Sequence, residues 1–141
     1  MRKLKKIISF VLSGGDIPKN KHLTLWFKPK GEEILDWVQR LGTEISYEEI
    51  CILQDQNVLT VVCQLEDEEL YKGHSLPHVT MECFDDATPV LSNDLIQQEM
   101  HSNAFSLRNE DATFERKAFL SAMFYSKEGK QYSTQTEDWE V

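Results

Sequence analysis

Alternation of apolar and polar residues, the pattern of a strand with one buried face, predicts most of the secondary structure. It is clearest over residues 22–27 and 78–83, where apolar side chains recur at every second position. Asp55-Gln56-Asn57 is a turn signal between two apolar runs and indicates a hairpin. Apolar runs predict the remaining strands, at residues 7–12, 49–53, 58–65, 89–91, 105–107 and 113–125.

Two helices are expected among these strands. Residues 31–41 repeat apolar side chains at helical spacing, with acidic residues near the start and Gly42 as a stop. A second helix should run to about Met100. It should begin at one of three residues that commonly cap helices, Ser92, Asn93 or Asp94. Residues 66–69 predict an acidic turn or short helix, so the mixture of elements predicts an α+β fold.

Composition is consistent with one domain, and the charge is unevenly distributed. The chain has 141 residues and a net charge of -9. Residues 1–30 hold eight Lys or Arg and one acid, whereas the rest holds seven bases and 23 acids. We expect a folded domain over residues 1–125 and a polar, acidic tail over residues 126–141. This charge disfavours binding of long nucleic acids but leaves a small phosphorylated ligand near the basic N-terminal third.

The N-terminus and the cysteines bear on location. Residues 1–12 resemble the basic and apolar parts of a secretory signal, but the apolar part is short and no A-x-A cleavage site follows. We interpret them as a first strand with a basic lead-in, and no apolar run approaches the roughly 18 residues of a membrane span. The three cysteines lack a C-x-x-C pair and lie in apolar segments, which predicts buried free thiols and a cytoplasmic protein: Cys51, Cys63 and Cys83.

Two four-residue segments share one pattern of histidine, apolar residue, threonine and apolar residue. They are His22-Leu23-Thr24-Leu25 and His78-Val79-Thr80-Met81. Positions i and i+2 of a strand share a face, so each histidine should point the same way as its threonine. Two histidines can supply the base and the acid for phosphodiester hydrolysis, and the hydroxyls can donate to the phosphate oxygens. The pattern therefore predicts a catalytic site that needs no metal.

A zinc site is the competing interpretation of the histidines. His22, His74, His78 and Cys83 could be drawn together, but they lack the short ligand spacing of a structural zinc site. His74 and His78 are four positions apart, and Pro77 opposes the helix that would align them. We therefore expect neither a metal ion nor a cofactor.

Five residues near the two motifs are candidates for substrate binding: Lys21, Lys28, Trp26, Tyr71 and Phe84. The lysines, with Lys19 and Lys30 beside them, could attract phosphate, and the alternative is a solvated basic loop. Trp26 is expected on the face of His22, where it could stack a base. For each aromatic side chain, packing in or beside the core is the alternative.

The paired motifs resemble the H-x-[ST]-x motifs that mark the 2H phosphoesterase superfamily, also called LigT-like. The resemblance covers about residues 7–125, and residues 89–95 look like the cyclic phosphodiesterase domain of fungal-type tRNA ligases. It implies two lobes of antiparallel sheet, flanked by a few helices, around a central cleft. It also implies that His22 and His78 are the acid–base pair and that Thr24 and Thr80 bind the phosphate.

This family likeness implies hydrolysis of a 2′,3′-cyclic phosphate, or of a 2′-5′-linked or cyclic nucleotide phosphodiester. We expect a small nucleotide or short oligonucleotide substrate, with no membrane and no obligatory protein partner. Within this class, degradation of immune second messengers, as by viral relatives, competes with RNA-end processing of the tRNA-ligase type. A nucleotide-binding module that keeps the cleft without catalysis is the third alternative.

Overall fold

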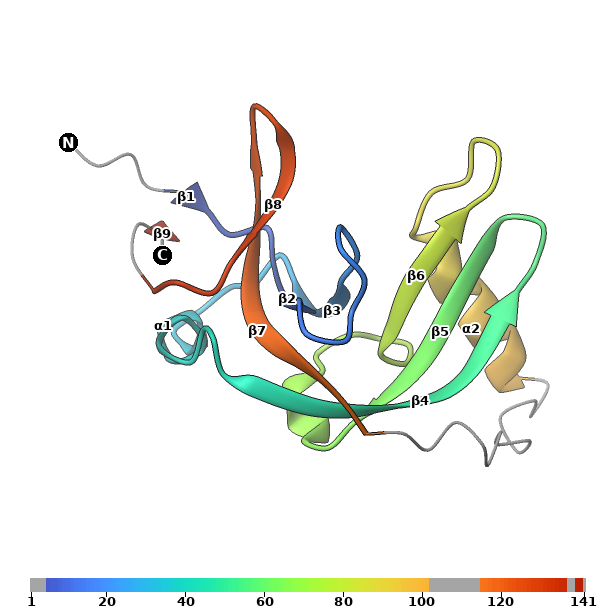
Figure 1. Cartoon of the computed structure of the whole chain (residues 1–141), viewed down its shortest axis with the longest axis horizontal. Helices are drawn as coiled ribbons and strands as arrows, with labels where there is room; N and C mark the ends of the chain where they lie inside the picture. Colours follow the sequence, from blue (N-terminus) through green and yellow to red (C-terminus); the bar gives the residue numbers. More distant parts are fainter. Residues whose placement is uncertain (1–4, 102–114, 137–138, 141) are drawn as a thin grey trace.

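The computed structural model describes residues 5–101, 115–136 and 139–140 of the chain. Two helices and a short 3-10 helix occur among its strands (Figure 1). In chain order the elements are β1 (Lys5–Lys6), β2 (Ser9–Ser13), β3 (Leu23–Phe27), α1 (Glu33–Gln39), β4 (Glu44–Gln54), β5 (Val58–Leu65), η1 (Glu68–Leu70), β6 (His78–Cys83), α2 (Leu91–His101), β7 (Glu115–Ser126), β8 (Gly129–Ser133) and β9 (Trp139–Glu140). The expected α+β class agrees with this mixture.

Seven strands form one antiparallel sheet in the order β2-β3-β6-β5-β4-β7-β8. Because β2 also pairs with β7, the pairings of six strands close into a ring. The long strand β4 pairs with β7 over residues 44–48 and with β5 over residues 47–54. It therefore joins β2, β3, β7 and β8 to β5 and β6 (Figure 1). The expected two lobes are thus parts of one hydrogen-bonded sheet.

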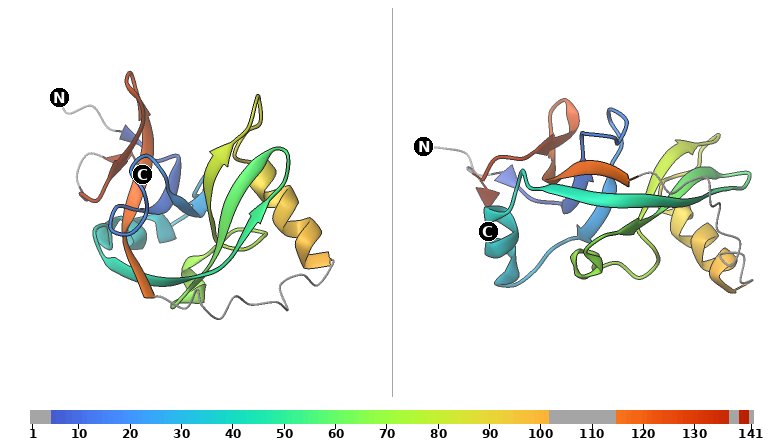
Figure 2. Two further views of the ribbon diagram at one scale, coloured as in Figure 1. Left: turned by 45° about the vertical axis from the view of Figure 1, so that its right-hand side comes forward. Right: turned by 60° about the horizontal axis from the view of Figure 1, so that its bottom comes forward.

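The helices lie at opposite ends of this sheet, α1 beside β1 and β9 and α2 beside β5 and β6 (Figure 1 and Figure 2). The strand expected at residues 89–91 is wrong, because the main chain there turns into α2. The N–H of Leu91 donates to the carbonyl of Thr88, and the N–H of Ser92 donates to that of Pro89. The strand expected at 105–107 lies outside the described residues.

One face of the sheet packs into the main hydrophobic core. Its fully buried side chains come from β2, β3, β5 and β7, and α1 adds Trp37 and Val38. Leu23 of β3 and Val79 of β6 belong to this core and are paired with each other on these adjacent strands. Because neighbouring residues of a strand point to opposite faces, the residues on either side of these two point away from the core.

The apolar N-terminal segment is a core strand, as expected. Ile7 is buried, and every residue of β2 is buried between β3 and β7. Within the described residues, no helix combines the length and apolarity that crossing a membrane requires.

The expectation of a tail at residues 126–141 is wrong. β8 pairs with β7 along its whole length, and β9 pairs with β1 in parallel. Trp139 of β9 is buried, packs edge-on against Phe124 and donates its indole N–H to the carbonyl of Gln135. The described residues after position 125 therefore belong to the folded domain.

The three cysteines are free, but their environments differ. Cys63 is buried, and burial raises the pKa of its thiol to about 12. Cys51 is partly buried. The prediction of burial is wrong for Cys83, which lies exposed at the end of β6.

Candidate active site

The two His-x-Thr motifs meet where β3 pairs with β6. Leu23 is opposite Val79, and the strands are antiparallel. The residue before Leu23 therefore lies beside the residue after Val79, and the residue after Leu23 lies beside the residue before Val79. This places His22 toward Thr80 and Thr24 toward His78. All four side chains are partly buried and share the face away from the main core.

His22 contacts a residue that the sequence does not single out. Its Nδ1 lies 2.9 Å from the Tyr132 hydroxyl oxygen, and the ring centroids are 5.7 Å apart. Tyr132 lies in β8, within the segment expected to be a tail. Burial raises the pKa of Tyr132 to about 12, so the phenol keeps its proton at neutral pH. Tyr132 is thus placed to orient the His22 ring through Nδ1.

The surroundings of His22 oppose a positive charge on its ring. Burial is the main cause that lowers its pKa from 6.5 to about 4, followed by the charges of Lys130, His78 and Lys21. His22 is therefore neutral at pH 7. The two motif histidines are close enough for the charge of one to act on the other.

His78 is held in one tautomer by the main chain. Its Nδ1 lies 2.8 Å from the carbonyl oxygen of Leu76. A carbonyl can only accept, so Nδ1 carries the proton and the neutral ring keeps its lone pair on Nε2. Burial lowers the pKa of His78, and the bond to Leu76 opposes that shift. The neutral ring is therefore suited to accept a proton at Nε2.

The two motif hydroxyls have different partners. The Thr80 Oγ1 lies 2.8 Å from the hydroxyl oxygen of Ser92, a buried residue in the first turn of α2. If Ser92 donates this bond, the Thr80 O–H can be donated to a ligand. For Thr24, the described residues provide no hydrogen-bond partner to the hydroxyl, which is therefore available.

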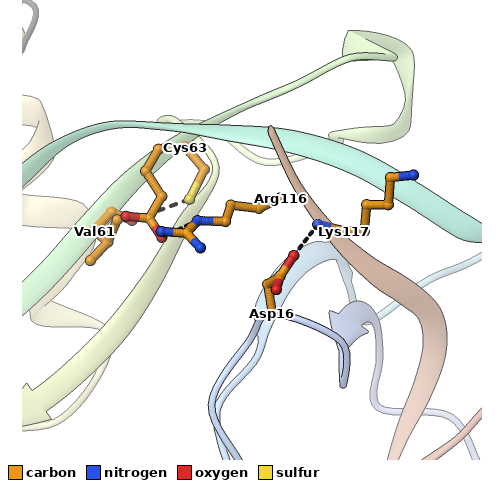
Figure 3. Close-up of polar contacts among 6 residues, drawn as sticks. Asp16, Val61, Cys63, Arg116 and Lys117 are labelled. Atoms are coloured by element: carbon orange, nitrogen blue, oxygen red, sulfur yellow. Dashed lines mark hydrogen bonds and ion pairs between the residues drawn. The ribbon is translucent and has the colours of Figure 1, made fainter. Parts of the chain in front are cut away.

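The loop before β3 is anchored to β7 and holds the start of the first motif. The N–H of Asp16 donates to the carbonyl of Lys117, and the N–H of Lys117 donates to the Asp16 carboxylate at 2.7 Å (Figure 3). Ile17 is buried beside this contact. Gly15 has φ +57°, and a Cβ there would overlap the Lys117 carbonyl oxygen. The loop therefore follows a path that glycine permits at this position.

Of the two lysines predicted to bind substrate, only Lys21 is shown near the motif histidines. Lys21 precedes His22 and is close enough to lower its pKa, after burial, Lys130 and His78. Lys28 follows the other end of β3, where its Nζ lies 5.3 Å from the Phe27 ring centroid. Lys28 thus lies at the opposite end of β3 from His22.

The aromatic candidates beside the second motif contact neighbouring loops. The Tyr71 hydroxyl lies 3.2 Å from the Ser75 hydroxyl, which donates to the side-chain oxygen of Asn93. Tyr71 also packs against the main core. Phe84 directly follows β6, is partly buried and donates its N–H to the carbonyl of Asn57. These contacts describe packing at the edges of β6 and leave base stacking as a prediction.

A β-bulge changes which face Trp26 occupies. Thr24 pairs with Val11, whereas Trp26 pairs with Phe10, so Leu25 is an extra residue in β3. Phe10 and Val11 are consecutive in β2 and point to opposite faces. Thr24 and Trp26 must therefore point to opposite faces as well.

The prediction that Trp26 shares the face of His22 is consequently wrong. Its ring packs against two core residues, with centroids 5.9 Å from Phe10 and 5.3 Å from Trp37. Beyond the bulge, Phe27 takes the position on the motif face and is 60% exposed. Phe27 is thus the aromatic side chain that β3 exposes on the motif face.

The comparisons with known proteins do not assign the chain to a family. A scan against protein-family models matches none, and a search of curated proteins finds no match. In the part of the chain that the structure describes, no three His, Cys, Asp or Glu side chains are grouped as a metal ion would require. The arrangement on which a function can be built is therefore two neutral imidazoles, two hydroxyls and nearby lysines.

Proposed function

We propose that the chain is a phosphodiesterase of the 2H type, which hydrolyses a phosphodiester bonded to a ribose 2′ or 3′ oxygen. The observation that carries the proposal is the pairing of Leu23 with Val79, which brings the two His-x-Thr motifs side by side. An isolated histidine on a strand is commonly structural. Two motifs of one pattern, aligned across one strand pair, provide an acid, a base and two hydroxyl donors.

In the proposed reaction, one neutral imidazole takes a proton from a water molecule as its oxygen attacks phosphorus. The bond from phosphorus to the ribose oxygen breaks, and the other histidine, protonated beforehand, gives its proton to that oxygen. A 2′,3′-cyclic phosphate thus becomes a phosphomonoester beside a free hydroxyl. The hydroxyls of Thr24 and Thr80 donate to the non-bridging oxygens, where negative charge builds in the transition state.

The tautomer of His78 supports its assignment as the base, because its lone pair is on Nε2 while Leu76 holds Nδ1. His22 is then the acid, and it must be protonated when substrate is bound. Its pKa is about 4, chiefly because of burial and then because of nearby positive charges. A bound phosphate supplies negative charge beside the ring, which raises that pKa toward neutrality.

The fold is compatible with this proposal at a coarser level. The sequence resemblance to 2H phosphoesterases implies two lobes of antiparallel sheet around a central cleft. Here β3 and β6 carry the motifs in the two strand groups that β4 joins. We propose that these groups correspond to the two lobes.

The test is turnover of a substrate panel in the presence of EDTA. The panel contains 2′,3′-cyclic mononucleotides, 2′-5′ oligoadenylate, and 3′-5′ and 2′-3′ cyclic dinucleotides. We expect hydrolysis of at least one class with EDTA present. His22→Ala and His78→Ala should each lower kcat by about 10²- to 10⁴-fold, the usual contribution of an acid or base.

His74→Ala is the matched control, because His74 is exposed and lies outside the motif pair. It should keep full activity. Folded protein that turns over no member of the panel would overturn the proposal and favour a nucleotide-binding module. Activity that survives both motif variants would also overturn it.

A further inference from the structure

Two lysines from separate segments lie beside His22. Lys21 directly precedes it in the loop that is anchored to β7, and Lys130 lies in β8. Lys130 is two residues before Tyr132 and so shares its strand face, and Tyr132 contacts the His22 ring directly. The charges of both lysines act on His22, and that of Lys21 acts on Lys130. The two lysines and His22 therefore form one cluster, and its two lysines are called the Lys21–Lys130 pair.

Within the described residues, this cluster has no acidic partner. The ion pairs of the described residues join Lys72, Arg116 and Lys117 to glutamates, and none involves Lys21 or Lys130. The whole chain nevertheless contains 24 acidic residues. Two like charges held together without a counter-charge raise the free energy of the site, and a bound anion lowers it. The cluster is therefore suited to an anion that the described residues do not supply.

The Lys21–Lys130 pair also lies next to the proposed reaction centre without being part of it. The proposed clamps for the reacting phosphate are Thr24 and Thr80, on β3 and β6. Lys130 comes from β8, and it is close enough to Cys83, at the end of β6, for the two groups to interact. The lysine pair thus lies on the β8 side of His22, beside the proposed position of the reacting phosphate.

We propose that Lys21 and Lys130 form a second phosphate site, so that the substrate is a nucleotide carrying at least one phosphate besides the reacting one. Short oligonucleotides, cyclic dinucleotides and 5′-phosphorylated cyclic nucleotides share this chemistry. A nucleoside 2′,3′-cyclic phosphate without a 5′-phosphate lacks it. The inference rests on the proposed function only in placing the reacting phosphate between His22 and His78.

The kinetic test compares adenosine 2′,3′-cyclic phosphate with the same compound bearing a 5′-phosphate. We expect kcat/KM to be about tenfold higher for the 5′-phosphorylated compound, as one charge-assisted contact provides. Lys130→Gln and Lys21→Gln should remove this advantage. Lys127→Gln removes the same charge from the exposed turn between β7 and β8 and should keep it. Equal kcat/KM for the two compounds in the unaltered protein would overturn the proposal.

A binding measurement separates this site from catalysis. Calorimetry with adenosine 2′-monophosphate and adenosine 2′,5′-bisphosphate needs no turnover. We expect the bisphosphate to bind about tenfold more tightly, and Lys130→Gln to abolish the difference. That result without hydrolysis of any substrate would keep the phosphate site and overturn the phosphodiesterase. Equal binding of the two ligands would overturn the second site whether or not the protein is active.

Discussion

The His22 ring lies among groups that oppose its protonation, which can be tested by titration. Its pKa is lowered from 6.5 to about 4, by burial first and by Lys130 next. Nuclear magnetic resonance of the imidazole nitrogens should show His22 neutral down to about pH 4. Lys130→Gln should raise the midpoint, because it removes a nearby positive charge. A midpoint near 6.5 in the unaltered protein would contradict the described environment.

The same shift predicts how stability depends on pH. The unfolded chain protonates His22 below about pH 6.5, whereas the folded protein does so only near pH 4. Between these values the unfolded state binds more protons, so the free energy of unfolding falls as the pH is lowered through this window. Above pH 6.5, His22 is neutral in both states and does not make the free energy of unfolding depend on pH.

Urea denaturation at several pH values measures this effect. His22→Gln should give a shallower fall in unfolding free energy between pH 6.5 and 4 than the unaltered protein. His74→Gln, which removes an imidazole from an exposed position, is the control variant. Identical slopes for His22→Gln and the unaltered protein would contradict the prediction.

Tyr132 is a positioning residue, since it acts through its contact with His22 Nδ1. Tyr132→Phe removes the hydroxyl and keeps the ring. We expect kcat to fall about tenfold, the effect of losing roughly one hydrogen bond, with little change in KM. The nitrogen chemical shifts of His22 should show an altered tautomer ratio. Tyr125→Phe is the control, because Tyr125 is 63% exposed in the neighbouring strand, and an unaltered tautomer ratio in Tyr132→Phe would argue against the role.

At the scale of elements, the alternating pattern predicts the motif strands because burial and register agree there. Leu23 and Val79 are core residues, so the positions next to them point away from the core. The same rule fails at Trp26 because the bulge at Leu25 reverses the alternation. A bulge depends on pairing with β2, and a period of two in β3 alone contains no sign of it.

β8 shows a second limit of sequence patterns. Its residues Gly129–Ser133 are polar, so no hydrophobic period distinguishes them from a tail. β7 extends beyond its pairing with β4, which ends at Phe119, and turns at residues 127–128 into β8. The glycine after that turn is a weak hairpin signal. Tyr132 and Lys130 were therefore beyond prediction, although Lys21, the histidines and the threonines were not.

The anchored loop before β3 predicts the effect of a small substitution. Gly15→Ala combines a positive φ with overlap of the Lys117 carbonyl oxygen. We expect the free energy of unfolding to fall by about 1–3 kcal/mol and kcat to fall as well, because the loop positions His22. Thermal unfolding and turnover measure these two effects.

Gly129→Ala is the matched control for this loop. Its φ is also positive, but a Cβ there would meet no atom within 4 Å. It should therefore cost backbone strain alone, and less stability than Gly15→Ala. Equal losses for the two variants would argue against the close approach of the loop to β7.

At the scale of the molecule, deletion of residues 126–141 tests whether the C-terminal strands unfold cooperatively with the rest of the domain. Deleting them removes β8, with Lys130 and Tyr132, and the buried Trp139. Trp139→Ala alone should cost about 3–5 kcal/mol, the usual loss for a buried large side chain, and the deletion should cost more. Denaturant unfolding measures both losses of unfolding free energy. If the shortened chain were as stable as the full chain, these residues would be a tail, as the sequence predicts.

The join between β3 and β6 differs from the rest of the seven-stranded sheet. Seven residue pairs align β4 with β5, whereas Leu23 and Val79 form the single aligned pair between the described residues of β3 and β6. Separating these two strands locally therefore breaks few main-chain hydrogen bonds. Amide protons along this join should exchange with solvent faster than those between β4 and β5. For the proposed phosphodiesterase, we expect this short join to let the two imidazoles separate around an incoming phosphate while the longer ladders stay intact.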